Sequence, residues 1–136
     1  MFNNNTLIKI IIVNNHPLFR EGLKLVFRKA NHIRLVAQTD TIEQALMFLK
    51  QQAVDLIITD LNASQVSTND IIVTIKQEFP HIKILVQTSY SDSEILNRII
   101  NSKADGYIFK NAGKHELLAA IDKITAGGTY YCDALS

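Results

Sequence analysis

Residues 7–17 read LIKIIIVNNHP, and they contain the end of one structural element and the start of the next. The first seven residues form a nearly continuous β-branched run, which is typical of a strand buried on both faces of a parallel sheet. Asn14, Asn15 and His16 end this run, and Pro17 suits the first turn of a helix. Apolar side chains then keep helical spacing to about residue 30, so the stretch predicts a strand followed by a helix.

The same alternation continues along the whole chain. Four more apolar runs predict strands, at residues 33–37, 55–59, 82–86 and 106–109. A helical pattern follows each of them, and segments 40–43 (in the form of a capping box) and 67–70 suit helix starts. Strictly alternating strands and helices predict a parallel sheet covered on both faces. We therefore expect an α/β fold, a flavodoxin-like (βα)5 three-layer sandwich with strand order 2-1-3-4-5.

Composition limits the class of protein. The chain has 136 residues, of which 47% are hydrophobic, enough for one domain with a real core. A net charge of +1 gives no electrostatic footprint for nucleic acid or for an anionic membrane. The single cysteine, Cys132, rules out a disulfide within the chain and favours a reducing, cytoplasmic location. No apolar run is long enough to span a bilayer, and we expect a soluble protein.

Polar side chains gather where the predicted strands end. Asn14 and Asn15 follow the first strand, and Asp60 follows the third. Thr88 and Lys110 follow the fourth and the fifth. In open α/β sheets ligands bind at the carboxyl ends of the strands, where the expected strand order brings these residues together. A carboxylate, a hydroxyl, a lysine and two amides suit a phosphoryl group or a metal–phosphate complex.

Four segments resemble the receiver domain of response regulators of the NarL/LuxR type, in order and without gaps. They are IIIVNNHPLFREGL at 10–23, DLIITDLN at 55–62, ADGYIFK at 104–110 and AGGTY at 126–130. The resemblance covers almost the whole chain and implies two-component signalling. It also implies that residues 1–129 form the receiver domain. Residues 130–136 would then begin a linker toward a C-terminal helix-turn-helix domain outside this chain.

The resemblance implies a role for four of the residues singled out. Asp60 would accept a phosphoryl group from the phosphohistidine of a sensor histidine kinase, as a carboxylate nucleophile. Lys110 would pair with the phosphoryl oxygens, and Thr88 would donate a hydrogen bond to them. Tyr107 would move inward with Thr88 and so alter the surface formed by the fourth helix, fifth strand and fifth helix. Apart from phosphorylating and dephosphorylating its own Asp60, the chain is not expected to be an enzyme.

The resemblance also implies a metal site, and here the chain departs from the family. Mg²⁺ would be held by Asp60, the amides of Asn14 and Asn15, and the backbone carbonyl of Asn62. The family usually has two aspartates in place of the two amides. Replacing two carboxylates by amides removes two negative charges, and each pair of unit charges near 4 Å is worth roughly 4 kcal/mol of gross attraction, much of it offset by desolvation. We expect affinity for Mg²⁺ to be roughly ten- to a thousand-fold weaker, with slow phosphorylation unless the donor is very good.

Two smaller departures and one residue beside the site complete the picture. The loop at residues 63–68 lacks the proline and glycine usual in the family, and Asn111 replaces an acid or a proline. His16 is interpreted as a helix-start residue rather than a ligand. The amide pair leaves an alternative open, a degenerate receiver that acts through phosphorylation-independent protein contacts.

Other classes of protein fit less well. A flavin or nucleotide binder would need a glycine-rich loop after the first strand, and residues 14–17 contain no glycine. A hydrolase would need a Gly-x-Ser-x-Gly elbow, which is absent. Binding to DNA is expected only through a further domain, and binding to membranes is not expected. A homodimer remains open, through the first and fifth helices or through the fourth and fifth.

Overall fold

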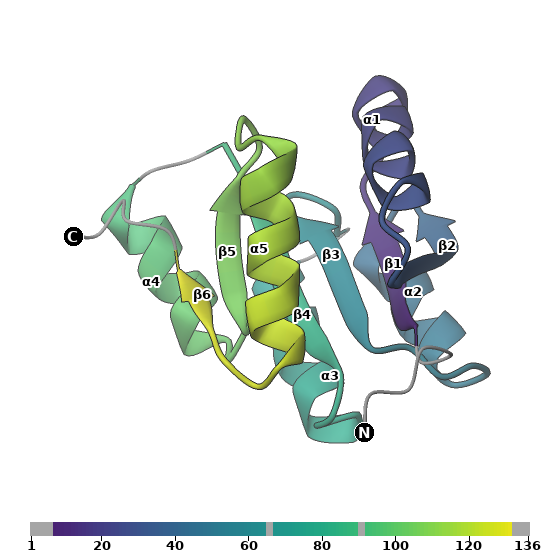
Figure 1. Ribbon diagram of the computed structural model, residues 1–136. Helices are drawn as coiled ribbons and strands as arrows, with labels where there is room; N and C mark the ends of the chain where they lie inside the picture. The colour runs from purple at the N-terminus through teal and green to yellow at the C-terminus, as the bar shows by residue number, and fades with distance from the viewer. Residues whose placement is uncertain (1–6, 65–66, 90–91, 132–136) are drawn as a thin grey trace.

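The computed structural model describes residues 7–64, 67–89 and 92–131. The elements follow one another as β1 (Ile8–Val13), α1 (Pro17–Arg28), β2 (Ile33–Thr39), α2 (Ile42–Leu49), β3 (Leu56–Asp60), α3 (Thr68–Glu78), β4 (Lys83–Thr88), α4 (Ser93–Asn101), β5 (Gly106–Phe109), α5 (Lys114–Thr125) and β6 (Tyr130–Tyr131). The strands form one parallel sheet of order β2-β1-β3-β4-β5-β6 (Figure 1). The expected flavodoxin-like sandwich is confirmed, with a sixth strand added at its edge.

Helices cover both faces of the sheet. Leu23 and Phe27 of α1 and Ile121 of α5 pack on one face, and α2, α3 and α4 pack on the other (Figure 1). The side chains of β1 alternate between these two layers. Ile10 faces α1 and α5, whereas Ile11 faces the opposite core, and neither is exposed to solvent. Burial on both faces explains why β1 is a continuous apolar run instead of an alternating one.

The helices α2, α3 and α4 start with a polar side chain that accepts a backbone hydrogen bond, although α2 starts a residue later than expected. The capping box lies at Thr41 and Gln44, because the Thr41 hydroxyl accepts from the Gln44 amide at 3.3 Å and the Gln44 side chain accepts from the Thr41 amide. The predicted capping box at residues 40–43 was therefore wrong by one position. Its first residue, Asp40, instead pairs with Arg20 at 2.9 Å. At α3 the predicted start is confirmed, since the Ser67 hydroxyl accepts from the Asp70 amide.

Tyr130 and Tyr131, which we expected to begin a linker, extend the sheet. Tyr130 lies opposite Gly106 and Tyr131 opposite Tyr107 in a parallel pairing of β6 with β5. The Tyr131 hydroxyl donates to the carbonyl of Ala104 at 2.9 Å, and its ring centroid is 5.5 Å from that of Tyr107. The remainder of the expected linker, residues 132–136, and Cys132 within it lie outside the described residues.

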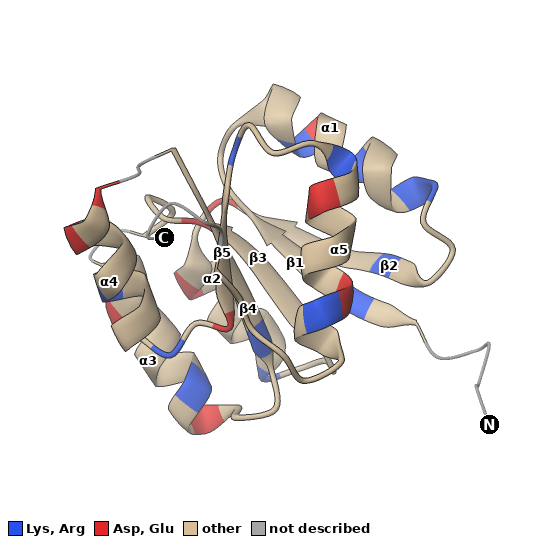
Figure 2. Ribbon diagram, turned by 60° about the vertical axis from the view of Figure 1, so that its left-hand side comes forward, with Lys and Arg blue, Asp and Glu red and all other residues tan. Residues whose placement is uncertain are grey.

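The distribution of charge agrees with the near-neutral composition. Basic and acidic segments are interspersed over the helices in the view of Figure 2. Within the described ranges, no helix has the length and apolarity needed to cross a membrane. The described surface therefore adds no electrostatic argument for binding an anionic polymer.

Candidate functional site

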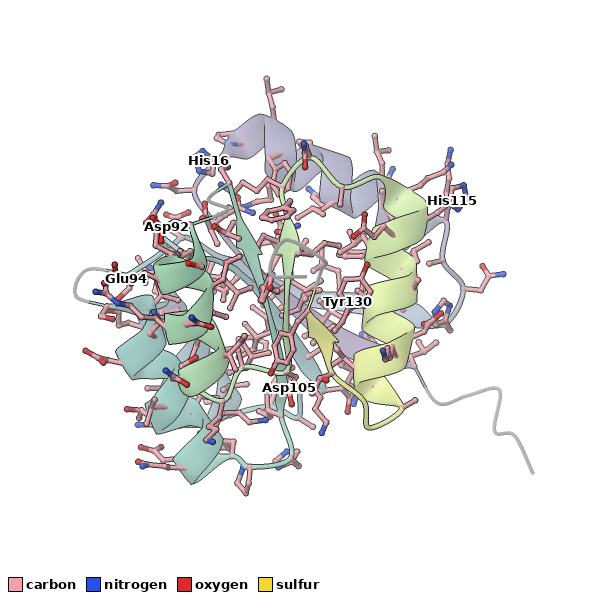
Figure 3. All side chains as sticks on the ribbon, turned by 90° about the vertical axis from the view of Figure 1, so that its left-hand side faces the viewer. His16, Asp92, Glu94, Asp105, His115 and Tyr130 are labelled. Carbon is pink, nitrogen blue, oxygen red and sulfur yellow. The ribbon has the colours of Figure 1, made fainter. Side chains whose placement is uncertain are left out.

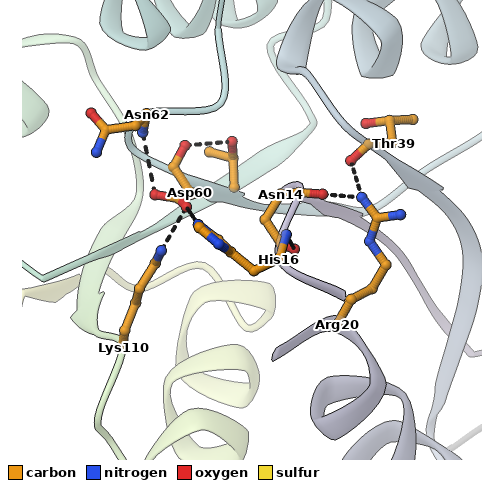
Figure 4. A network of polar contacts seen from close by, with 8 residues as sticks. Asn14, His16, Arg20, Thr39, Asp60, Asn62 and Lys110 are labelled. Carbon is orange, nitrogen blue, oxygen red and sulfur yellow. Dashed lines mark hydrogen bonds and ion pairs between the residues drawn. The ribbon is translucent and has the colours of Figure 1, made fainter. Parts of the chain in front are cut away.

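Asp60 is the last residue of β3, the central strand between β1 and β4, and only 4% of its surface is exposed. Lys110 follows β5, and its Nζ lies 2.6 Å from Asp60 Oδ2 (Figure 4). The backbone of Lys110 is fixed as well, because its N–H donates to the carbonyl of Thr88 at 3.0 Å. The predicted convergence of Asp60 and Lys110 at the carboxyl edge of the sheet is therefore observed.

The two charges form a pair with limited access to water. The side chain of Asp60 is 6% exposed and that of Lys110 is 22% exposed. The ammonium also lies 5.7 Å from the centroid of the Phe19 ring on α1, within the range of a cation–π contact. Removing one partner of such a pair leaves a buried charge without compensation, at a cost of roughly 3–5 kcal/mol. The lysine thus balances the charge of Asp60.

The two predicted switch residues lie on β4 and β5, and the Thr88 carbonyl accepts from the Lys110 amide. Thr88 is the last residue of β4 and is 1% exposed. Tyr107 is fully buried, with ring centroids of Phe109 at 6.5 Å and Tyr131 at 5.5 Å. The Tyr107 ring is thus already buried in this structure, and its movement together with Thr88 stays a prediction. The contact with β6, which sequence reasoning did not foresee, supports the ring in this position.

The amides of the expected metal site differ from one another in their surroundings. Asn14 is 1% exposed and its Oδ1 accepts from the backbone N–H of His16 at 3.0 Å, whereas Asn15 is exposed. The backbone N–H of Asn62 donates to Asp60 Oδ1 at 3.2 Å, so this loop folds back on the carboxylate. Carboxylate and amide oxygens are of the type that a hard cation prefers, but among these groups only the Asp60 carboxylate carries charge. A cation at this edge would have one carboxylate to bind, and Asn14 Oδ1 would have to give up its bond to His16.

Sequence reasoning missed the role of His16. Its Nε2 lies 3.1 Å from Asp60 Oδ2, the same oxygen that Lys110 contacts (Figure 4). An ionised carboxylate only accepts, so the ring nitrogen is the donor. His16 is the residue before α1, as predicted, but its side chain makes no capping hydrogen bond. The only signal available in the sequence was its position directly after the two amides.

Arg20 was also missed, and it fixes the edge of the site. Its guanidinium donates to the backbone carbonyl of Asn14, to the carbonyl of Thr39 at 3.0 Å and to the Asp40 carboxylate at 2.9 Å. These contacts connect α1 to the carboxyl ends of β1 and β2 (Figure 4). Arg20 therefore helps to hold the backbone from which Asn14 and His16 extend.

An open hollow of about 510 Å³ adjoins the Asp60–Lys110 pair. It is lined by Phe19, Thr88, Ser89, Phe109, Lys110 and Asn111. Two hydroxyls, an amide and the ammonium supply hydrogen-bond donors, and two rings form apolar walls.

The family follows from a comparison with known proteins. The sequence profile of the response regulator receiver domain matches residues 10–122. This chain belongs to that family, which confirms the predicted resemblance to the receiver domains of response regulators.

Relatives and solved structures agree with this assignment. The transcriptional regulatory protein MctR of Rhizobium johnstonii is 27% identical over 124 residues, which cover 91% of this chain and 58% of MctR. The oxygen regulatory protein NreC of Staphylococcus haemolyticus is 31% identical over 124 residues, covering 90% of this chain and 57% of NreC. The isolated receiver domain of RcsB from Salmonella enterica serovar Typhimurium, solved with the phosphomimetic BeF3⁻, superposes with a TM-score of 0.85 at 20% identity, covering 95% and 96% of the two chains. The chain thus spans little more than half the length of these curated relatives.

Proposed function

We propose that this receiver domain accepts a phosphoryl group on Asp60 from a sensor histidine kinase. The observation that carries the proposal is the buried Asp60 carboxylate with the Lys110 ammonium 2.6 Å away, at the carboxyl edge of a parallel sheet. Membership of the receiver family supports it. In the transfer step, a bond forms between an Asp60 oxygen and phosphorus while the bond from phosphorus to the kinase histidine nitrogen breaks. The histidine retains the bonding electron pair.

Three side chains would then respond to the new dianion. The Lys110 ammonium follows the phosphoryl oxygens as a point charge, and the Thr88 hydroxyl donates to them. Any displacement of Thr88 changes the packing of Tyr107, which lies on the neighbouring strand. Val86 pairs with Tyr107 and Thr88 with Phe109 in the β4–β5 register, so the two strands are coupled directly. The phosphorylated state then favours one arrangement of the α4–β5–α5 surface over another.

Asp60, Asn14, Asn15 and the carbonyl of Asn62 are the residues that would hold Mg²⁺ in this proposal. When bound, the ion neutralises charge on the phosphoryl oxygens during transfer. The chain itself positions the nucleophile and supplies the lysine. Because the site offers a single carboxylate, we expect the ion to bind together with the phosphoryl group rather than alone.

The output is proposed to be control of transcription. MctR is a transcriptional regulatory protein, and this chain matches 58% of its length. The α4–β5–α5 surface would act on a LuxR-type DNA-binding domain outside this chain, in a cytoplasmic protein that can pair as a homodimer. Beyond phosphorylation and dephosphorylation of its own Asp60, we propose no enzymatic activity.

Intact mass measurement tests the phosphorylation step. The chain is incubated with acetyl phosphate and saturating Mg²⁺, and Asp60→Asn is treated in parallel. The expected result is a gain of one phosphoryl group by the original chain and none by Asp60→Asn. If the original chain gains nothing from acetyl phosphate or from a panel of sensor kinases, Asp60 is not a phosphoacceptor and the proposal is wrong.

A further inference from the structure

The His16 ring makes a contact that the proposed transfer does not use. Its Nε2 donates to Asp60 Oδ2 at 3.1 Å, although the side chain is 54% exposed. Among the described residues this is the only polar contact of the ring. The ring does not cap α1, so the contact with Asp60 is not a by-product of starting the helix.

The donors around Asp60 are divided unequally between its two oxygens. Oδ2 accepts from Lys110 Nζ at 2.6 Å and from His16 Nε2 at 3.1 Å, while Oδ1 accepts from the Asn62 amide at 3.2 Å. A carboxylate has about four lone-pair directions, two on each oxygen. Both directions of Oδ2 are therefore occupied. Oδ2 is also the oxygen next to Lys110, where a phosphoryl group would find its counter-charge.

We propose that His16 is a removable cap on Asp60 that slows its phosphorylation, an inference that rests on the proposed function of this site. For Oδ2 to bond to phosphorus, one of its two donors must leave. The Lys110 ammonium stays beside Oδ2, because its charge is also needed by the phosphoryl oxygens, so the imidazole is the donor that has to swing away. His16 is thus a positioning residue that acts through Asp60, and the site in its unmodified state is closed.

The local backbone allows the ring to leave without disturbing the fold. Pro17 fixes its own φ at the first turn of α1. Asn14 Oδ1 holds the backbone N–H of His16 at 3.0 Å. Rotation about the side-chain bonds of His16 alone can therefore open Oδ2, and the exposed ring has solvent to move into.

Substitutions at position 16 separate the hydrogen bond from the rest of the side chain. His16→Asn is too short to reach Asp60 but is a favourable residue before a helix, so folding is protected. His16→Ala removes the ring entirely. His16→Gln places an amide N–H near the position of Nε2 and should restore the cap. His32→Asn is the matched control, because His32 makes a similar contact with Asp122 at 2.9 Å away from the site.

The measurement is the rate of Asp60 phosphorylation by acetyl phosphate, followed by intact mass, with thermal melting of each variant as a folding control. As the Asp60 Oδ2–P bond forms, the P–O bond of acetyl phosphate breaks and acetate leaves with the electron pair. His16→Asn and His16→Ala are expected to react about tenfold faster than the original chain, equivalent to about 1.4 kcal/mol in the barrier. His16→Gln should stay near the original rate, and His32→Asn should not change it.

The outcomes distinguish the cap from the function on which it rests. Equal or slower reaction of folded His16→Asn and His16→Ala would overturn the cap while leaving the phosphoacceptor proposal intact. Reaction of His16→Gln as fast as His16→Ala would overturn it too, since the hydrogen bond would not be what limits the rate. No phosphorylation of any variant overturns both proposals, because opening Asp60 would then expose no phosphoacceptor.

Discussion

At the scale of single residues, the site balances the charge of Asp60 with cations and donors from the chain itself. Lys110, His16 and the Asn62 amide all contact the one buried carboxylate. The adjacent side chains are neutral amides, so they add oxygen atoms without adding charge. A divalent cation gains little from such a site until a phosphoryl dianion is also present.

Restoring the acids tests this explanation. The double variant Asn14→Asp, Asn15→Asp should bind Mg²⁺ roughly ten- to a thousand-fold more tightly, because two carboxylates then face the cation. Isothermal titration of the chain with Mg²⁺ measures the change. The control is Asn31→Asp, Asn101→Asp, which makes the same change in net charge at exposed positions in a loop and at the end of α4. Equal affinity in the double variant and the original chain would show that the amides do not limit binding.

At the scale of elements, β5 is held between β4 and a short sixth strand. Gly106, the first residue of β5, lies so close to β6 that a Cβ atom there would be 2.3 Å from the carbonyl oxygen of Tyr130 and 2.9 Å from Ile124 Cδ1. The backbone of Tyr130 cannot move aside as easily as the end of a flexible side chain. The close approach of β6 therefore requires glycine at this position.

Substitution of this glycine should separate β6 from β5. Gly106→Ala is expected to lower the free energy of unfolding by roughly 1–3 kcal/mol, as overpacking does in other buried sites. Gly22→Ala is the matched control, since nothing lies within 4 Å of a Cβ at this exposed helical position. Gly22→Ala should raise the free energy of unfolding by roughly 0.5–1 kcal/mol. Urea unfolding of both variants gives the values, and a neutral Gly106→Ala would mean that β6 can move aside freely.

At the scale of the whole molecule, β5 connects the candidate site to a second polar network. Figure 3 places His16 and Asp105 toward opposite ends of the molecule. The Asp105 carboxylate accepts from Lys76 Nζ at 3.0 Å and from the Ile84 amide at 2.8 Å. It precedes Gly106 and Tyr107, and Tyr131 of β6 packs on Tyr107. A shift of Tyr107 would therefore change its packing against Tyr131 of β6, the last strand that the structure describes.

Stability at alkaline pH reports on the β6 contact. Burial raises the pKa of the Tyr131 phenol above its usual value near 10, and the Asp105 carboxylate raises it further. The folded state then keeps a proton that the unfolded state releases above pH 10, so stability falls as pH rises through that range. Below pH 10, Tyr131→Phe should be less stable by roughly 0.5–1.5 kcal/mol, since the hydrogen bond to Ala104 is lost.

Comparison of the two chains isolates this contribution. The difference in unfolding free energy between the original chain and Tyr131→Phe should shrink from pH 9 to pH 11, because the Tyr131 phenol is the one titrating group that differs between the two chains. Urea unfolding at half-unit intervals measures it. A difference that stays constant over this range would contradict the buried state of the Tyr131 hydroxyl.

The sequence by itself determined the order of strands and helices and the residues at the carboxyl edge. Runs such as residues 7–13 carry their own periodicity, and parallel pairing places every strand end at one edge. Asp60 and Lys110 could therefore be predicted as neighbours although 50 residues separate them. The first five strands could be predicted without knowledge of side-chain conformations.

Only the tertiary structure decided the other side-chain contacts of the site and of β6. Three contacts leave no periodic signal in the sequence: that of His16 with Asp60, that of Arg20 with the carbonyls of β1 and β2, and that of Tyr131 with Tyr107. Each contact depends on rotamers and on the separation between elements, which are set by packing of the two cores. Local sequence fixes where a strand ends, whereas the partner of a side chain is fixed by everything packed around it.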